Sequence, residues 1–198
     1  MTRPLILGIA FIAAALLVFA TEVFIAWPAR EQAVPQNLVT IGGPFSMTDH
    51  RGRSVSEKNF QGKARAVFFG FTACPDICPT MLTRMASLLD QLGADADKVN
   101  VILVSVDPER DTPDVLASYL QAFDPRITGL TGTAEQLADF AKRYRVFYEK
   151  VAGEGGSYTM NHTSGVLLFD ADGNFQSIID GHEAEEMALK KLERVISG

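Results

Sequence analysis

The only two cysteines of this 198-residue chain, Cys74 and Cys78, lie in the six-residue segment CPDICP at positions 74–79. The apolar stretch 66–72 before this segment predicts a buried strand, and residues 79–89 after it predict a helix with one apolar face. A strand, a short loop and a helix start would place both sulfurs at the positive end of a helix dipole, where a thiolate is favoured over a thiol. Soft-metal binding and disulfide exchange both require a thiolate, so the segment predicts one of these two functions.

The rest of the chain predicts alternating strands and helices around this segment. Residues 45–48 and 54–56 predict an N-terminal hairpin that turns at Gly52. The other expected elements are strands at 99–106, 127–130, 145–151, 165–170 and 175–179, helices that begin near 113 and 134, and a final amphipathic helix. Early strand–helix units followed by a hairpin and a helix are typical of an α/β fold with a thioredoxin-like central sheet flanked by helices.

Residues 4–27 form an apolar segment that is interrupted only by Thr21 and Glu22. Its length of roughly 20 residues or more matches the hydrocarbon core of a bilayer. We interpret residues 1–27 as a single N-terminal transmembrane anchor with Trp27 at the outer interface. The alternative is a signal peptide that is cleaved after Ala20.

Either interpretation of the leader predicts export of the domain that follows it. Residues 28–40 are a polar, proline-containing linker, and residues 41–198 are expected to form the folded domain. Because no long Arg- and Ser-rich presequence precedes the apolar segment, we expect a bacterial inner membrane with the soluble domain facing the periplasm. The net charge of −6, without a block of basic residues, argues against nucleic acid as a partner.

The two cysteines allow three interpretations. Two cysteines of an exported protein most often form a structural disulfide, but a loop of five residues constrains the unfolded chain very little. Dithiol oxidoreductases of this layout usually carry C-x2-C, whereas this chain carries C-x3-C. The additional residue leaves room for a metal ion between the sulfurs and still permits a disulfide.

His162 is the candidate for a third ligand, because it lies just before a buried strand and after the Gly-rich segment 152–158. We expect that segment to be a mobile loop that faces the dithiol. The other two histidines, His50 and His182, are expected to be solvent-exposed or to cap a helix. Two thiolates and one imidazole suit Cu(I) and also Zn(II), and the softness of the sulfur ligands favours copper.

Four further side chains have both a functional and a structural interpretation. Helical spacing favours a core position for Met81. For Met160 the sequence does not decide between a core position and a position at the site. Asp76 either stays in solvent or tunes the site from outside the ligand set. Asp107 ends a strand at the same sheet edge as the cysteines, so it lies near the metal or caps the turn before Pro108.

Three sequence motifs resemble the Sco/SenC family of copper proteins. They are FGFT at 69–72 running into CPDICPT at 74–80, SVDPERDT at 105–112, and Tyr158 followed by Asn161 and His162. The resemblance implies a thioredoxin-like fold and a copper site made of Cys74, Cys78 and His162. It also implies a role in assembling cytochrome c oxidase. Position 73, often aromatic or His in that family, is Ala73 and offers no further ligand.

Our hypothesis from the sequence is therefore a membrane-tethered copper metallochaperone. It receives copper from a donor protein and metallates the binuclear copper centre of cytochrome c oxidase subunit II. The runner-up is a thiol–disulfide reductase in which Cys74 and Cys78 are the redox-active pair and keep the cysteines of a partner reduced. A peroxidase of the peroxiredoxin kind is disfavoured, because C-x3-C is not its pattern.

Overall fold

A computed structural model of the chain describes residues 40–197. The predicted anchor at 1–27 and all but the last residue of the predicted linker lie outside these residues. Within the part of the chain that is described, no helix combines the length and the apolar composition that crossing a bilayer demands.

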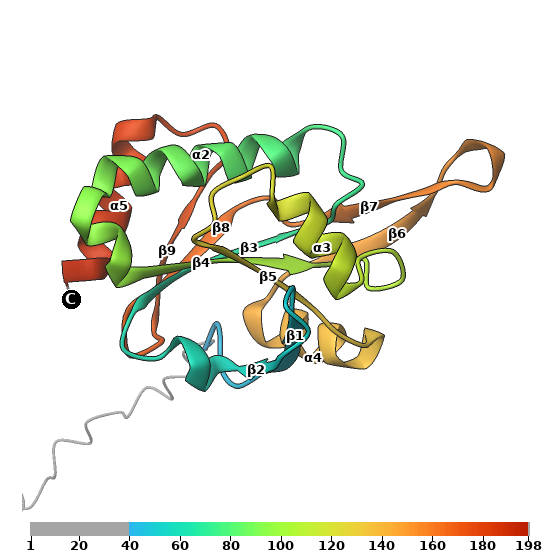
Figure 1. Ribbon diagram of the computed structural model, residues 1–198, viewed down its shortest axis with the longest axis horizontal. Coiled ribbons are helices and arrows are strands. Elements are labelled where there is room, and N and C mark those ends of the chain that lie inside the picture. The colour runs from blue at the N-terminus through green and yellow to red at the C-terminus, as the bar shows by residue number, and fades with distance from the viewer. Residues whose placement is uncertain (1–39, 198) are drawn as a thin grey trace, which may run out of the picture. The chain divides into compact units, whose positions relative to one another are not determined.

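Seven of the described strands form one mixed sheet in the order β2-β1-β5-β4-β3-β8-β9 (Figure 1). These strands are β1 (Ser46–Asp49), β2 (Ser54–Ser56), β3 (Ala64–Gly70), β4 (Val99–Ser105), β5 (Ile127–Thr131), β8 (Val166–Phe169) and β9 (Phe175–Ile179). Strands β3, β4 and β5 run parallel, and the outer strands pair antiparallel to their neighbours. The sequence predicts each of these strands, with ends that coincide or differ by at most two residues.

The helices cover both faces of the sheet. They are α2 (Ile77–Leu92), α3 (Pro113–Leu120), α4 (Ala134–Tyr144) and α5 (Glu185–Ser197), with short 3-10 turns at Glu57–Phe60, Gly93–Lys98 and Glu154–Gly156. Figure 1 shows α2, α3 and α5 on one face and α4 on the other. The chain moves from β3 to β4 and then to β5 in the same direction across the sheet. Because both connections are right-handed crossovers, α2 and α3 lie on the same face.

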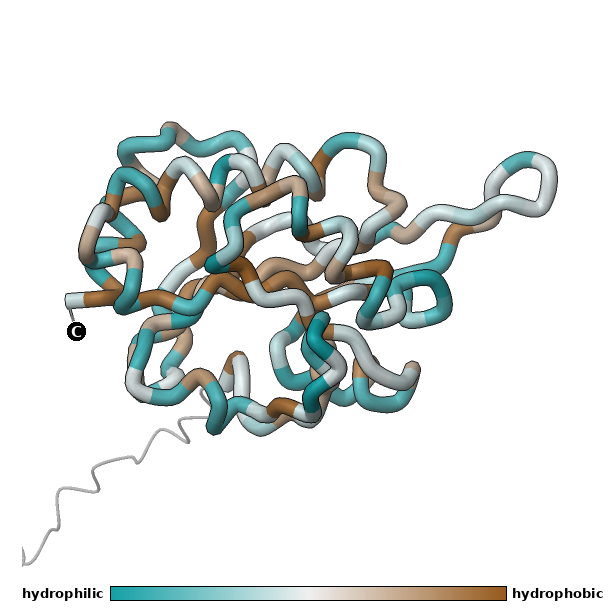
Figure 2. Tube along the Cα trace, in the orientation of Figure 1, coloured by the Kyte–Doolittle hydropathy of each residue, from teal (hydrophilic) through white to brown (hydrophobic). Residues whose placement is uncertain are grey.

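The core lies between these layers. All seven residues of β3 are buried, as expected for a strand covered on both faces. Figure 2 shows the hydrophobic residues concentrated along the central strands. The predicted helix starts are confirmed: the Thr112 side chain accepts from the Val115 amide, and Thr133 forms a capping box with Gln136.

The segment before His162 is a β-hairpin: the strand expected at 145–151 is confirmed as β6, the expected Gly-rich loop is its turn, and the second strand was not predicted. Strands β6 (Tyr148–Ala152) and β7 (Tyr158–His162) pair antiparallel over five residue pairs and form a sheet of their own. Figure 1 shows this hairpin extending beyond the end of the large sheet. Only residues 153–157 form the turn, where Gly155 and Gly156 adopt positive φ. The glycines therefore mark the tip of a hairpin and not a flexible tether for His162.

Candidate metal centre

The two cysteines lie where the chain passes from the end of β3 into α2. Cys74 is half-buried in the connecting loop, and Cys78 is fully buried in the first turn of the helix. Both thiols are free, and the Cys78 amide donates a hydrogen bond to Cys74 Sγ at 3.4 Å. The loop therefore turns both sulfurs to one side, where they can act together.

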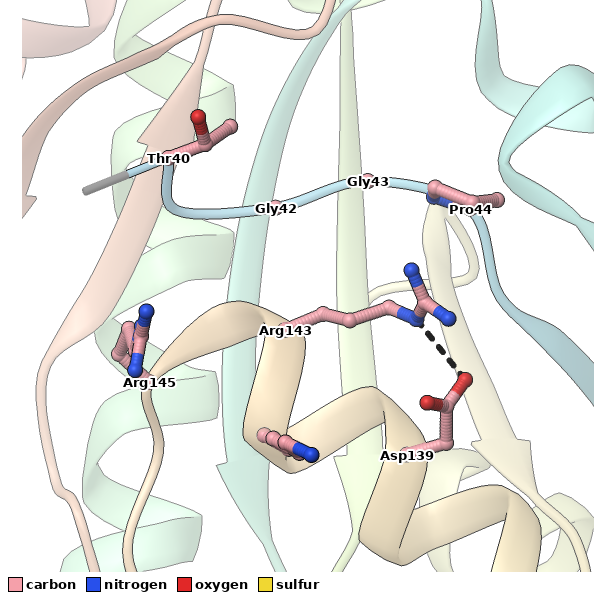
Figure 3. A pocket seen from close by; sticks show the side chains of 8 residues that line it. Thr40, Gly42, Gly43, Pro44, Asp139, Arg143 and Arg145 are labelled. Carbon is pink, nitrogen blue, oxygen red and sulfur yellow. Dashed lines mark hydrogen bonds and ion pairs between the residues drawn. The ribbon is translucent and has the colours of Figure 1, made fainter. Parts of the chain in front are cut away.

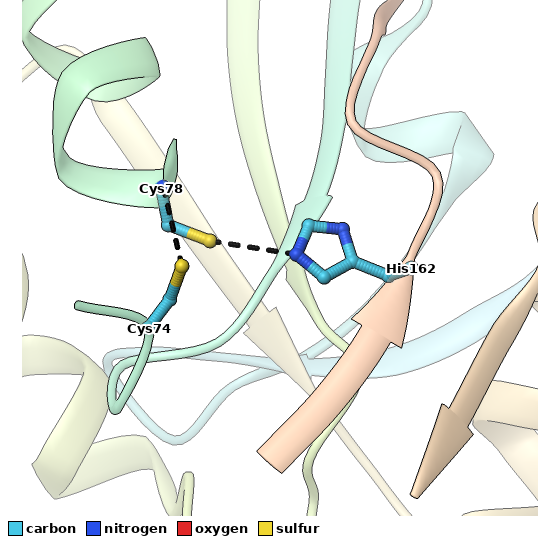
Figure 4. A group of neighbouring side chains, drawn as sticks. All are labelled: Cys74, Cys78 and His162. Carbon is cyan, nitrogen blue, oxygen red and sulfur yellow. Dashed lines mark hydrogen bonds between the residues drawn. The ribbon is translucent and has the colours of Figure 1, made fainter. Parts of the chain in front are cut away.

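His162 reaches the sulfurs from the end of β7, as Figure 4 shows. Its Nε2 lies 3.6 Å from Cys78 Sγ, and the ligand atoms of Cys74, Cys78 and His162 lie within 4.8 Å of one another. Its Nδ1 lies 2.9 Å from the Thr163 carbonyl oxygen, which can only accept, so Nδ1 carries the proton and donates. The Nε2 lone pair is thereby left facing the sulfurs, as a metal ligand requires.

The imidazole sits against aromatic side chains. Phe68 and Phe71 both contact it edge to face, with ring centroids 6.1 and 5.8 Å away. Burial lowers the pKa of His162, and the hydrogen bond with Thr163 only partly offsets that effect. The ring is therefore held in its neutral form, which is the form that can bind a metal.

Burial also dominates the chemistry of Cys78. It raises the pKa of the Cys78 thiol far above its ordinary value, and the neighbouring Cys74 raises it further. The expectation that the helix start would favour a thiolate is therefore wrong for Cys78 in the metal-free protein. The cost of removing a charge from water exceeds the stabilisation by the helix dipole. A bound cation would be needed to hold Cys78 as a thiolate.

The structure decides the roles of the other sequence candidates. Met81 and Met160 are both buried in the hydrophobic core. Asp76 is exposed, with Thr80 donating to its carboxylate at 3.4 Å. His182 is exposed as expected, whereas His50 is half-buried and accepts a hydrogen bond from the Gly129 amide at 3.1 Å.

Asp107 is not part of the ligand cluster that the described residues form. It is 2% exposed, and its carboxylate accepts hydrogen bonds from the Tyr158 hydroxyl at 3.0 Å and from the Arg110 side chain. Asp111 is fully buried and accepts hydrogen bonds from Thr72. Neither contact could be found from helical or strand periodicity.

Tyr119 of α3 is a further polar side chain in the neighbourhood of the sulfurs. Its hydroxyl is buried and has no hydrogen-bond partner among residues 40–197. Burial raises the pKa of this phenol, and negative charge on the Cys78 and Cys74 sulfurs would raise it further. The phenol therefore stays protonated in the neighbourhood of the sulfurs.

A separate cavity lies away from the two cysteines and His162. It has a volume of about 530 Å³ and is lined by residues 40–44 and by the end of α4 (Figure 3). Lys142, Arg143 and Arg145 contribute its charge, with Arg143 paired to Asp139 at 2.9 Å. No cysteine or histidine lines it, and α4 covers the face of the sheet opposite α2.

The fold and the site together define a class: a thioredoxin-like domain whose dithiol faces an imidazole. A model of the SCO1/SenC family matches residues 33–197. The chain belongs to this family.

The relatives include copper-bound structures. ScoI of Bradyrhizobium japonicum, solved with copper bound, is 46% identical and superposes with a TM-score of 0.73, over 78% of this chain and 99% of that one. Protein SCO2 of Saccharomyces cerevisiae, a mitochondrial protein, is 37% identical over 161 residues. That match covers 80% of this chain and 54% of SCO2, so the chain spans about half the length of that relative.

A third relative concerns the redox state of the cysteines. BsSco, described as a member of the Sco family of cytochrome c oxidase assembly proteins with a disulfide switch, is 25% identical. It superposes with a TM-score of 0.64 over 80% of this chain and 95% of its own.

Proposed function

We propose that this chain is a copper metallochaperone that binds Cu(I) through Cys74, Cys78 and His162. One observation carries the proposal: two sulfurs and one unprotonated imidazole nitrogen converge within 4.8 Å. Two soft sulfur ligands and one imidazole suit Cu(I) in a three-coordinate site. A structural Zn(II) site requires four ligands, and the described residues supply only these three to the cluster.

The low coordination number suits transfer rather than storage. Cys74 is half-buried and lies at the outer side of the pair, whereas Cys78 is fully buried. A thiol of a partner can therefore reach the copper on the side of Cys74 while Cys78 still holds it. As the partner thiolate binds, His162 and then the two cysteines leave, and the incoming cysteine ligands take over the ion.

We propose the copper centre of cytochrome c oxidase subunit II as the recipient and a separate copper protein as the donor. The support is membership in the SCO1/SenC family, together with a relative that is described as an oxidase assembly protein. A membrane anchor at residues 1–27 would hold the domain on the periplasmic face of a bacterial inner membrane, beside the oxidase. The apolar leader supports this placement.

The second candidate function is that of a thiol–disulfide reductase. The Cys78 amide donates to Cys74 Sγ at 3.4 Å, a contact that would stabilise a Cys74 thiolate as a nucleophile. In that reaction one thiolate attacks a partner disulfide, the second cysteine resolves the mixed disulfide, and the partner leaves with two thiols. This reaction does not require His162.

The test compares the wild-type chain with C74S/C78S and H162A variants. Each is loaded with Cu(I) under reducing conditions and mixed with the copper-binding domain of a subunit II. A metallochaperone loses binding in the double serine variant and binds more weakly, with altered transfer, in H162A. Copper binding and transfer that do not change in H162A, together with rapid reduction of an oxidised subunit II by the wild type, would instead favour the reductase.

A further inference from the structure

The loop between β4 and α3, residues 106–112, contacts both halves of the candidate metal centre. Strands β3 and β4 run parallel and in register, with Gly70 paired to Ser105. Their carboxyl ends therefore lie side by side at one edge of the sheet. The segment that leads to the cysteines leaves β3 there, and the 106–112 loop leaves β4 beside it.

Asp111 is the contact to the cysteine half. Its buried carboxylate accepts hydrogen bonds from the Thr72 amide at 3.0 Å, the Thr72 hydroxyl at 2.5 Å and the Ser105 hydroxyl at 2.6 Å. Thr72 is two residues before Cys74, whose own amide donates to the Phe71 carbonyl at 3.2 Å. This carboxylate thus fixes the backbone from which the cysteine loop starts.

Tyr158 is the contact to the histidine half. Side chains of a strand alternate between its faces, so Tyr158, Met160 and His162 share the inner face of β7. Their burial agrees, because Thr159 and Asn161 between them are exposed. Tyr158 lies at the far end of that face from His162, about 13 Å away at the usual rise of a strand.

Three charged side chains, Asp107, Arg110 and Lys150, contact Tyr158. Its hydroxyl donates to Asp107 Oδ1 at 3.0 Å. The guanidinium carbon of Arg110 lies 3.9 Å from the ring centroid, and Lys150 Nζ lies 4.0 Å from it. Arg110 also donates to the Tyr158 carbonyl at 3.1 Å and to the same Asp107 carboxylate. Lys150 belongs to the hairpin, so the contacts of Asp107 and Arg110 are the ones that join the hairpin to the 106–112 loop, well away from His162 itself.

Arg110 extends this connection to the imidazole. Its guanidinium carbon lies 5.7 Å from the Phe71 ring centroid, and Phe71 in turn contacts His162 edge to face. The hairpin is otherwise a separate two-stranded sheet with no strand pairing to the large one. Its position over the cysteines therefore depends on side-chain contacts of this kind.

We propose that Asp107 and Tyr158 are positioning residues for His162: they fix the hairpin so that the imidazole stays over the sulfurs. The proposal rests on the proposed copper function and names the element that controls the third ligand. Loss of the Tyr158–Asp107 hydrogen bond lets the hairpin move outward, and His162 then leaves the copper more often. The dithiol still holds the ion, so release to an acceptor becomes faster.

The test is a double-mutant cycle on the full chain with Cu(I) and a chromophoric Cu(I) chelator as the acceptor. Y158F keeps the ring and removes only the hydroxyl. We expect it to speed copper transfer ~3–10-fold, which is within the range that loss of one typical hydrogen bond gives. In an H162A background the same substitution should change the rate by less than about twofold, because its effect passes through His162.

A second measurement is independent of copper. Amide hydrogen exchange of the metal-free chain should rise over residues 148–162 in Y158F and in D107N. The matched control is Y148F: Tyr148 lies directly opposite His162 in the hairpin, and its hydroxyl makes no hydrogen bond among the described residues. This control should change neither exchange nor transfer.

Two results would overturn the proposal. One is unchanged exchange of the hairpin in both Y158F and D107N. The other is an acceleration of transfer by Y158F that is just as large in the H162A background. If the wild-type chain bound no Cu(I), the proposed function would fall, and the exchange data of the metal-free protein would still decide whether the hairpin is fixed in this way.

Discussion

Cys78 Sγ and His162 Nε2 lie 3.6 Å apart although 84 positions separate them in the chain. One belongs to the first turn of α2, and the other ends a hairpin that is not part of the large sheet. Both groups are shielded from water, which raises the pKa of the thiol and lowers the pKa of the imidazole. The metal-free site therefore favours the neutral forms of Cys78 and His162, and binding of a cation to both must displace the Cys78 proton.

The first prediction concerns the reactivity of the two thiols. Cys74 is half-buried and Cys78 is fully buried with a raised pKa. At pH 8 iodoacetamide should therefore modify Cys74 at least ~10 times faster than Cys78, because only an accessible thiolate reacts. Mass spectrometry of the metal-free, reduced chain measures both rates. In guanidinium the two rates should become similar, and equal rates in the native chain would contradict the buried position of Cys78.

The second prediction concerns the pH dependence of copper binding. Because the pKa of Cys78 is raised, its thiol is protonated in the metal-free protein near neutral pH and must lose that proton to bind Cu(I). The apparent Cu(I) affinity should therefore rise with pH between 6.5 and 9, by about tenfold or more per pH unit. Burial lowers the pKa of His162 below its ordinary 6.5, so the imidazole adds no slope in this range. Competition with a chelator of known pH dependence measures the Cu(I) affinity at each pH. An affinity that does not change with pH would contradict the prediction.

The third prediction concerns Gly70, the last residue of β3. A Cβ at this position would lie 2.9 Å from Cys78 Sγ, 3.0 Å from Phe68 and 3.3 Å from Leu103. G70A should therefore destabilise the fold by ~1–3 kcal/mol, the usual cost of overpacking a core, and should shift the Cys78 sulfur and weaken copper binding. Urea unfolding and copper titration measure the two effects.

The matched control for Gly70 is Gly181, where an added Cβ would meet only Met81 at an ordinary 3.6 Å. G181A should leave both stability and copper affinity close to the wild type. If G70A behaved in the same way as G181A, that result would contradict the close packing of β3 against the Cys78 sulfur.

The fourth prediction concerns the buried carboxylate of Asp111. In D111N an amide group replaces one acceptor oxygen among three hydrogen-bond donors, so we expect a loss of ~1–3 kcal/mol in the free energy of unfolding. Copper should also dissociate faster, because Thr72 no longer fixes the start of the cysteine loop. Chemical denaturation and copper transfer to a chelator measure these changes.

T133A provides the comparison for D111N. It removes the capping box of α4 and should cost about 1 kcal/mol, but α4 lies on the face of the sheet opposite α2. It should therefore destabilise the domain without changing copper dissociation. Equal effects of the two variants on dissociation would mean that Asp111 acts through general stability alone.

Local patterns were enough to predict most of the fold. The apolar run of β3, the helical stripe of α2 and the capping box at Thr133 are each patterns of residues close in sequence. The prediction was incomplete at the hairpin β6–β7: the first strand and the glycine-containing turn were expected, but the second strand was not. The alternation of buried Met160 with exposed Thr159 and Asn161 was the available signal, but a two-residue period over so short a segment is weak.

The sequence by itself determined which atoms are present: two thiols at a fixed spacing, one imidazole and the secondary structure that carries them. Only the tertiary structure decided that His162 faces the sulfurs, that Cys78 stays a thiol until a cation arrives, and that Asp107 and Asp111 contact opposite halves of the site. The physical reason is that the packing of strands and helices sets how far apart side chains of remote segments lie and how deeply each is buried. Local sequence periodicity does not specify either quantity.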